Sequence, residues 1–138
     1  KLIPTVINKI LNNENIPIYG KGNNIRDWLY VGDHAQAIDV VYHLGIDGNT
    51  YNIGGNTEKT NIEIVIEICR LMEDKLDDYN NLGRLITFVK DRAGHDFRYA
   101  IDCHKITNKL GWVPQTRFIE GLSKTIDWYI EKYFGNTK

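Results

Sequence analysis

The sequence has few cysteines, no long apolar run and no excess of charge of either sign. Two cysteines, Cys69 and Cys103, cannot form the disulfide framework of a small secreted domain, so we expect reduced thiols in a cytoplasmic protein. The longest apolar stretches, such as residues 64–66, are too short to span a bilayer. Because 17 Lys and Arg balance 18 Asp and Glu, we expect neither a nucleic-acid nor a membrane partner.

The sequence also has a single methionine, Met72, and it opens at Lys1 directly into a helical pattern. We therefore expect the chain to be a piece of a longer protein. Its 138 residues, 42% of them hydrophobic, are enough to bury the core of one domain. No repeat or low-complexity linker divides it, so we expect one domain over residues 1–138.

Hydrophobic periodicity predicts helices joined by short, scattered strands. Helices are expected over residues 3–11, 33–45, 60–76, 102–111 and 118–133, and extended segments over 16–19, 28–31, 50–53 and 85–89. Residues 20–24 are expected to form a glycine turn and residues 91–96 a charged loop. The pattern is that of an α/β protein that lacks a complete doubly wound sheet.

Three helix starts carry residues that favour the N-cap position. Thr60 and Glu63 fit the capping box, in which each side chain binds a free amide of the first turn. Asp33 and Asp102 are expected to cap the helices that follow them. The helix after Thr60 has apolar residues on more than one face, so we expect it to be buried on most sides.

Several motifs of self-sufficient enzymes are absent. Gly20 and Gly22 precede an extended segment rather than a helix, so they do not form the dinucleotide-binding G-x-G-x-x-G turn. There is no C-x-x-C, no zinc-type histidine spacing and no G-x-S-x-G nucleophile motif. From the residues alone, the chain is not a complete enzyme of a recognisable class.

Three polar segments nevertheless stand between apolar elements. Arg26 could present its planar donors to a carboxylate or a diphosphate, or form an ion pair with Asp27 or Asp33. The loop over residues 91–96 could be a solvated surface loop, or its charges could face a ligand. Asn61 could bind a phosphate or sugar hydroxyl in the first turn of its helix, or be an ordinary surface residue.

Two further residues have alternative interpretations. Cys69 lies on an apolar stripe and is expected to be a core residue rather than a reactive thiol. Tyr19 follows Pro17 in an extended segment and could belong to the core or form a flat wall for a stacked ring.

The order of these motifs resembles the carboxy-terminal half of the dTDP-glucose 4,6-dehydratases, members of the extended short-chain dehydrogenase/reductase family. The matching segments are K-L-I-P at residues 1–4, P-I-Y-G-K-G at 17–22, I-R-D-W-L-Y-V at 25–31, Y-N-I-G-G at 51–55 and D-R-A-G-H-D at 91–96. Residues 98–102 (R-Y-A-I-D) and 110–112 (L-G-W) continue the match. The stretch over residues 91–102 is the most particular to this family.

The resemblance implies a helix-rich, carboxy-terminal substrate-binding portion whose NAD-binding Rossmann core is mostly absent. It implies a parent lyase that oxidises dTDP-glucose at C4, eliminates water across C5–C6 and reduces C6, giving dTDP-4-keto-6-deoxyglucose for rhamnose-type precursors. The catalytic residues and the NAD site are expected upstream of Lys1, and the parent is expected to dimerise through that missing domain. This chain alone is expected to be inactive.

The resemblance also implies a set of residues that contact the dTDP-sugar. Lys1 and Leu2 match positions beside the phosphates, and residues 17–19 match the segment that lines the thymine site. The full set is Lys1, Leu2, Pro17, Ile18, Tyr19, Arg26, Asn61, Asp91, Arg92 and His95. Two alternatives stay open: a related epimerase or decarboxylase that uses UDP- or GDP-sugars, and a non-catalytic nucleotide-binding module.

Overall fold

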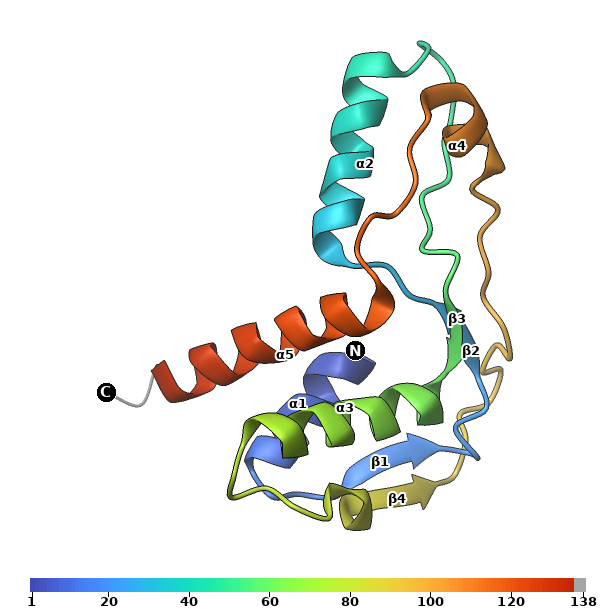
Figure 1. Cartoon of the computed structure of the whole chain (residues 1–138). Coiled ribbons are helices and arrows are strands. Elements are labelled where there is room, and N and C mark those ends of the chain that lie inside the picture. Colours follow the sequence, from blue (N-terminus) through green and yellow to red (C-terminus); the bar gives the residue numbers. More distant parts are fainter. Residues whose placement is uncertain (136–138) are drawn as a thin grey trace. The chain divides into compact units, whose positions relative to one another are not determined.

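The computed structural model describes residues 1–135, which divide into two compact units (Figure 1). The first unit comprises residues 1–24, 60–97 and the chain from residue 122 onward. The second comprises residues 25–59 and 98–121. Each unit is thus assembled from segments that lie far apart in the sequence.

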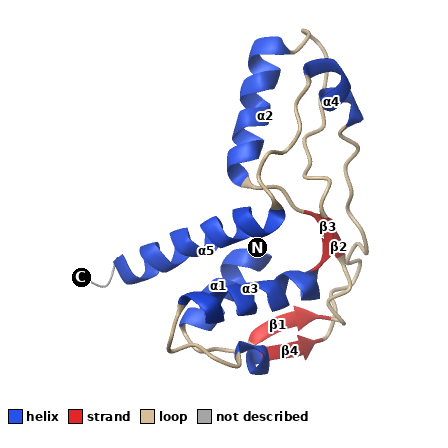
Figure 2. Ribbon diagram, in the orientation of Figure 1, coloured by secondary structure: helices blue, strands red, loops and turns tan. Residues whose placement is uncertain are grey.

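The first unit contains two paired strands and most of the buried residues. Its elements are α1 (Leu2–Leu11), β1 (Ile16–Tyr19), α3 (Asn61–Lys75), the short 3-10 helix η1 (Leu82–Leu85), β4 (Ile86–Val89) and the greater part of α5 (Phe118–Gly135). β1 and β4 lie side by side and run in parallel, with Ile16 opposite Ile86 and Tyr19 opposite Val89 (Figure 2). The expected helix 3–11 and the extended segment 16–19 are confirmed, and the segment 85–89 is confirmed from Ile86 onward, since Leu85 belongs to η1.

The core of the first unit is built on the apolar faces of α1 and α3. Its fully buried side chains include Val6, Ile7 and Ile10 of α1, Ile16 and Ile18 of β1, Ile64, Val65, Ile68 and Met72 of α3, and Ile126 of α5. The prediction that α3 is buried on most sides is confirmed. Among the apolar residues of α3, Ile66 is 54% exposed, so the expectation that it lies on the buried stripe is wrong.

The capping box of α3 is present as predicted. The Thr60 hydroxyl accepts from the Glu63 amide at 3.3 Å, and the Thr60 amide donates to Glu63 Oε2 at 2.7 Å. These two bonds satisfy amides that have no partner within the helix. The start of α3 is therefore fixed by local sequence.

The second unit packs two helices around a small core. Its elements are β2 (Ile25–Asp27), α2 (Val31–Leu44), α4 (His104–Leu110) and β3 (Glu58–Thr60), which pairs with β2 and whose last residue belongs to the first unit. Its hydrophobic core contains the buried residues Ala37, Cys103, Ile106 and Trp112. As predicted, α2 ends at Gly45 and α4 ends at Gly111, whose φ of +70° favours glycine.

The strands predicted over residues 28–31 and 50–53 are wrong. The structure has its strands at 25–27 and 58–60 instead. Asp27, the last residue of β2, instead fixes the chain that leads into β3, because its carboxylate accepts from the amides of Gly55 at 2.6 Å and Thr57 at 2.7 Å. Tyr51 and Ile53 pack against the core of the second unit from irregular backbone, so their apolar alternation did not require a strand.

The predicted cap at Asp33 is also wrong. Tyr30 is the N-cap of α2, and Asp33 lies inside the first turn with only 5% of its surface exposed. Its carboxylate accepts from the Gln115 amide at 3.2 Å, the Thr116 amide at 2.9 Å and the Thr116 hydroxyl at 3.0 Å. Asp33 therefore ties α2 to the segment after α4.

The predicted cap at Asp102 is displaced by one residue. Cys103 occupies the N-cap position of α4, while Asp102 Oδ1 accepts from the His104 amide at 2.8 Å. Asp102 therefore satisfies a first-turn amide from one position earlier than expected.

The predicted fold class is confirmed in these elements. The described residues form an α/β structure with two separate two-stranded sheets, β1 with β4 and β2 with β3, and no doubly wound sheet. Within residues 1–135, none of the helices combines the length and the apolar character needed to cross a membrane.

We expect Asp33→Ala to lower the free energy of unfolding by about 2–3 kcal/mol, because it removes the buried carboxylate that accepts from the amides of residues 115 and 116. Urea titration followed by circular dichroism measures this loss. Asp39→Ala on the same helix is the matched control, since its exposed pair with His43 at 3.4 Å contributes little. An equal effect of both substitutions would contradict the structural role of Asp33.

We also expect both thiols to resist labelling in the folded chain. Burial, with a smaller contribution from Glu73, raises the pKa of Cys69 to about 11, and burial likewise raises the pKa of Cys103. At pH 8 a thiol reagent should react with neither until the chain is unfolded in urea. The exposed variant Thr50→Cys is the positive control, and rapid labelling of the folded parent chain would contradict the buried placement of both thiols.

Candidate functional site

The candidate site begins where β1 and β4 end together. Tyr19 is the last residue of β1 and lies opposite Val89, the last residue of β4. The Gly20 amide donates to the Val89 carbonyl at 2.9 Å, which extends the pairing by one bond. The strands are parallel, so their carboxyl ends share one edge, and the loop over residues 91–96 leaves β4 there.

Four side chains form a connected group at this edge, here called the Tyr19 cluster: Tyr19, Asp91, Arg92 and His95. The Arg92 guanidinium lies over the Tyr19 ring, 4.8 Å from its centre. His95 Nδ1 lies 2.7 Å from Asp91 Oδ1, and His95 Nε2 lies 3.3 Å from Arg92 Nη2. The imidazole also meets the Tyr19 ring edge-on, with 6.4 Å between ring centres. The structure thus brings together four of the predicted site residues.

The members of the Tyr19 cluster differ in their exposure. Only 7% of the His95 side chain is exposed, whereas Asp91 retains 43% and the Tyr19 residue 41%. Arg92 is exposed. Tyr19 and Arg92 therefore offer accessible surface, while His95 is largely enclosed.

The charges of this loop are mutually paired. The hydrogen bond from His95 lowers the pKa of the Asp91 carboxyl, and the Arg92 amide, which donates to Asp91 Oδ1 at 2.8 Å, adds to this effect. A lowered pKa means that ionised Asp91 favours the folded loop above its ordinary pKa, and that this contribution is lost as pH falls through the lowered value. The loop is thus not merely a solvated run of charges.

Gly20 is a site residue that the sequence analysis assigned only to a turn. Its φ is +57°, and a Cβ at this position would lie 3.0 Å from Asp91 Oδ2. A side chain here would therefore be strained and would press on the Tyr19 cluster. The sequence feature that could have identified Gly20 is its position immediately after Tyr19, the aromatic residue that ends the strand.

Pro17 and Ile18 occupy opposite faces of β1. Ile18 is 2% exposed and belongs to the core, whereas Pro17 and Tyr19, one position to either side, are less buried. Alternation along a strand places Pro17 and Tyr19 on the same face. Any contact that Ile18 makes with a ligand would have to use its backbone.

Asn61 is the first residue of α3, but the amides at this helix end are already used. The Asn61 amide donates to the Asn24 carbonyl at 3.0 Å, and the Ile62 amide to the Gly22 carbonyl at 3.0 Å. The next amide, of Glu63, binds the Thr60 hydroxyl. Recognition here would therefore use the Asn61 side chain and not the helix terminus.

The other predicted residues do not join the Tyr19 cluster. Lys1 is the exposed N-cap of α1 and Leu2 its first residue, and neither has a hydrogen bond or ring contact with the cluster in the part of the chain that the structure describes. Arg26 lies on β2 in the second unit. Its Nη1 donates to the Ile25 carbonyl at 2.6 Å, and its guanidinium lies 5.0 Å from the ring centre of Tyr99.

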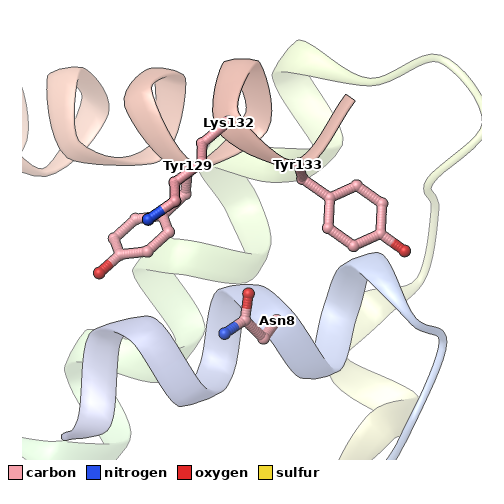
Figure 3. Close-up of a pocket in the computed structure, with 4 residues that line it drawn as sticks. All are labelled: Asn8, Tyr129, Lys132 and Tyr133. Atoms are coloured by element: carbon pink, nitrogen blue, oxygen red, sulfur yellow. The ribbon is translucent and has the colours of Figure 1, made fainter. Parts of the chain in front are cut away.

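A separate hollow of about 300 Å³ lies between α1 and α5 in the first unit (Figure 3). Asn8, Tyr129, Lys132 and Tyr133 line it. Its polar groups are partly engaged, since the Tyr133 hydroxyl lies 3.1 Å from Asn12 Oδ1 and Lys132 lies over the Trp128 ring. None of these residues belongs to the predicted site.

The described residues do not form a dinucleotide-binding turn. The Gly20 and Gly22 amides bind the carbonyls of Val89 and Tyr19, and the turn leads into β2 rather than into a helix. A pyrophosphate site needs such amides to be free at a helix start. Residues 1–135 also bring no three His, Cys, Asp or Glu side chains together as a metal site.

Comparison with known proteins identifies the sequence relatives. The chain is 51% identical over 134 residues to a dTDP-glucose 4,6-dehydratase of Escherichia coli, an alignment that covers 94% of this chain and 37% of that protein. The chain therefore spans well under half the length of the curated relatives it matches.

Solved structures agree with this relationship. A dTDP-glucose 4,6-dehydratase from Bacillus anthracis in complex with NAD matches with a TM-score of 0.81 at 45% identity, over 95% of this chain and 39% of that one. A dTDP-glucose 4,6-dehydratase from Streptomyces venezuelae, with NAD and a second ligand bound, matches with a TM-score of 0.84 at 37% identity, over 98% and 40%.

These matches confirm the resemblance that the motifs indicate. The family model described as GDP-mannose 4,6 dehydratase matches residues 1–125, which is most of the chain. Its span contains the paired strands, the glycine turn and the whole Tyr19 cluster. The chain belongs to the GDP-mannose 4,6-dehydratase family of extended short-chain dehydrogenases/reductases, and within it is similar to the dTDP-glucose 4,6-dehydratases.

Proposed function

We propose that residues 1–138 are the nucleotide-sugar-binding domain, the helix-rich carboxy-terminal part, of a dTDP-glucose 4,6-dehydratase. The observation that carries this proposal is the guanidinium of Arg92 held over the exposed Tyr19 ring. An aromatic ring beside a fixed positive charge suits a ligand that joins a flat base to a diphosphate. The names of the sequence relatives support the same ligand class.

Arg92 retains the capacity to bind an anion. A guanidinium carries five N–H donors, and only the one facing His95 is engaged by a side chain in the described part of the chain. The remaining donors can meet phosphate or ribose oxygens in a planar, charge-assisted arrangement. Asn61, Arg26, Lys1 and Leu2 are proposed as further contacts, by their match to the family motifs.

The proposed parent reaction is the net dehydration of dTDP-glucose to dTDP-4-keto-6-deoxyglucose. Oxidation at C4 would acidify the C5 proton, water would leave across C5–C6, and reduction at C6 would complete the net dehydration. NAD supplies the hydride chemistry, and the glycine turn of this chain does not fit it. We therefore place the NAD site and the catalytic residues in another part of the parent, and we propose that this chain alone is inactive.

The similarity to the dTDP-glucose 4,6-dehydratases also supports proposals about the location, the assembly and the pathway of the parent protein. The parent is proposed to be a cytoplasmic homodimer that pairs through its cofactor domain and supplies rhamnose-type deoxysugar synthesis. This chain contributes the specificity for the nucleotide, while the rest of the parent carries out the chemistry.

The rival proposal is a related enzyme that recognises a different base. The family model takes its description from a GDP-sugar enzyme, whereas the Escherichia coli relative is named for dTDP-glucose. Membership of the family therefore leaves the choice of base open. Preference among dTDP, UDP and GDP separates the two proposals directly.

We expect the folded chain to bind dTDP more tightly than UDP or GDP in a calorimetric titration, with circular dichroism confirming the fold. Arg92→Ala should weaken dTDP binding by about tenfold or more, because it removes charge-assisted hydrogen bonds to the ligand. Arg84→Ala is the matched control in the same unit, since Arg84 binds the side chain of Asn13 at 2.8 Å, away from the Tyr19 cluster.

Three other outcomes would contradict the proposal. Equal or tighter binding of UDP or GDP would favour the rival enzyme. Equal losses in Arg92→Ala and Arg84→Ala would remove Arg92 from the site. A folded chain that binds no nucleotide would show that residues 1–138 do not form a binding domain by themselves.

A further inference from the structure

His95 connects the acidic and the basic member of the Tyr19 cluster. Its Nδ1 faces Asp91 Oδ1 at 2.7 Å, and its Nε2 faces Arg92 Nη2 at 3.3 Å. Both ring nitrogens are thus engaged within the protein, and 7% of the side chain is exposed. This leaves the imidazole little surface for contacting a ligand itself.

The chemistry of the two neighbours determines where the proton of His95 lies. A guanidinium only donates hydrogen bonds, so Nε2 has to accept from Arg92. An ionised carboxylate only accepts, so Nδ1 has to carry the proton and donate it to Asp91. The arrangement therefore fits the neutral imidazole in its Nδ1–H form, and no other protonation state satisfies both neighbours.

The backbone reinforces the same geometry. The Arg92 amide donates to Asp91 Oδ1 at 2.8 Å, and the His95 amide donates to the Arg92 carbonyl at 3.3 Å, which closes the turn at Gly94. Gly94 has a φ of +68°, a conformation that glycine adopts readily. The loop therefore presents His95 to Arg92 from a fixed direction.

We propose that His95, as the neutral Nδ1–H imidazole, is a positioning residue that holds the Arg92 guanidinium over the Tyr19 ring. Arg92 is then oriented for an anionic ligand, and the N–H groups that do not face His95 stay available as donors. The positioning role itself rests on the geometry of this cluster. Its effect on nucleotide binding rests on the proposed function above.

Protonation of His95 would disrupt this arrangement. A proton on Nε2 would place a donor and a positive charge against Arg92, which is itself a donor and a cation. Within residues 1–135, the charged and titratable groups in contact with the imidazole are Asp91, Arg92 and Tyr19. Asp91 would favour the protonated ring, but it is already satisfied by the neutral Nδ1–H form, so the new repulsion falls on Arg92.

The consequence for binding is opposite in sign to that of direct contact. If His95 touched the diphosphate, protonation would add a favourable charge and tighten binding as pH falls. If His95 positions Arg92, protonation of His95 releases the guanidinium and binding weakens. The sign of the pH dependence therefore separates the two roles.

The first test uses nuclear magnetic resonance on the nitrogen-15-labelled 138-residue chain without ligand. At pH 8 we expect His95 to show a protonated Nδ1 and a bare Nε2, and the Arg92 Cδ protons to be shifted by the Tyr19 ring. On lowering the pH to 5.5, both signatures should disappear together. The exposed residues His34 and His43 are internal controls, and His95→Gln assigns the His95 signals.

Two results of this test would overturn the positioning role. One is a His95 that carries its proton on Nε2 at pH 8. The other is an Arg92 ring shift that persists unchanged after His95 is protonated. Neither result requires a nucleotide, so this test is independent of the proposed function.

The second test compares dTDP binding at pH 8 and pH 5.5 in the parent chain and in His95→Gln. The glutamine amide can donate to Asp91 and accept from Arg92 without titrating, so this variant should retain binding at pH 8. We expect the parent to lose at least threefold more affinity than His95→Gln between the two pH values. Protonation of dTDP itself affects both proteins equally and cancels in this comparison.

The two tests distinguish the possible failures. Tighter binding by the parent at pH 5.5, relative to His95→Gln, would assign His95 to direct ligand contact and overturn the positioning role. If a folded chain binds no dTDP at either pH while the nuclear magnetic resonance signatures are present, the proposed function fails and the positioning of Arg92 stands.

Discussion

The parallel pairing of β1 with β4 is the constraint on which the candidate site depends. These strands lie far apart in the sequence, so closing the intervening chain has an entropic cost that local contacts cannot offset. Burial of Ile16 and Ile18 beneath α1 and α3 supplies the compensating hydrophobic free energy. Once the strands pair, Tyr19 and the loop over residues 91–96 necessarily meet at the same edge.

At that edge, paired charges make a stable loop from residues that would otherwise repel or remain solvated. His95 contacts Asp91 through one ring nitrogen and Arg92 through the other, and the Arg92 guanidinium lies over the Tyr19 ring. Gly20 permits the close approach of Asp91 because it has no side chain. The order of donors and acceptors, rather than net charge, leaves Arg92 available to a ligand.

Carboxylates serve two different purposes in this chain. Asp27 and Asp33 accept from backbone amides of distant segments in the second unit, so they hold the fold. Asp91 instead accepts from an imidazole at the exposed edge of the first unit, where it organises a site. The same residue type therefore contributes to structure or to recognition according to the donor it meets.

The sequence by itself determined what depends on near neighbours. The capping box at Thr60, the apolar stripes of α1 and α3 and the glycine stop at Gly111 act over a few residues, so local pattern predicted them. The motif over residues 91–96 likewise indicated the family before any geometry was known.

Only the tertiary structure decided what depends on distant partners. It buried Asp33 against Thr116, placed the strands of the second unit at 25–27 and 58–60 rather than at the predicted positions, and turned the Ile18 side chain into the core. It also brought His95 between Asp91 and Arg92 and set both beside Tyr19. These outcomes escape local pattern because a polar side chain can satisfy its hydrogen bonds with many donors, and the folded chain alone determines which donor lies within reach.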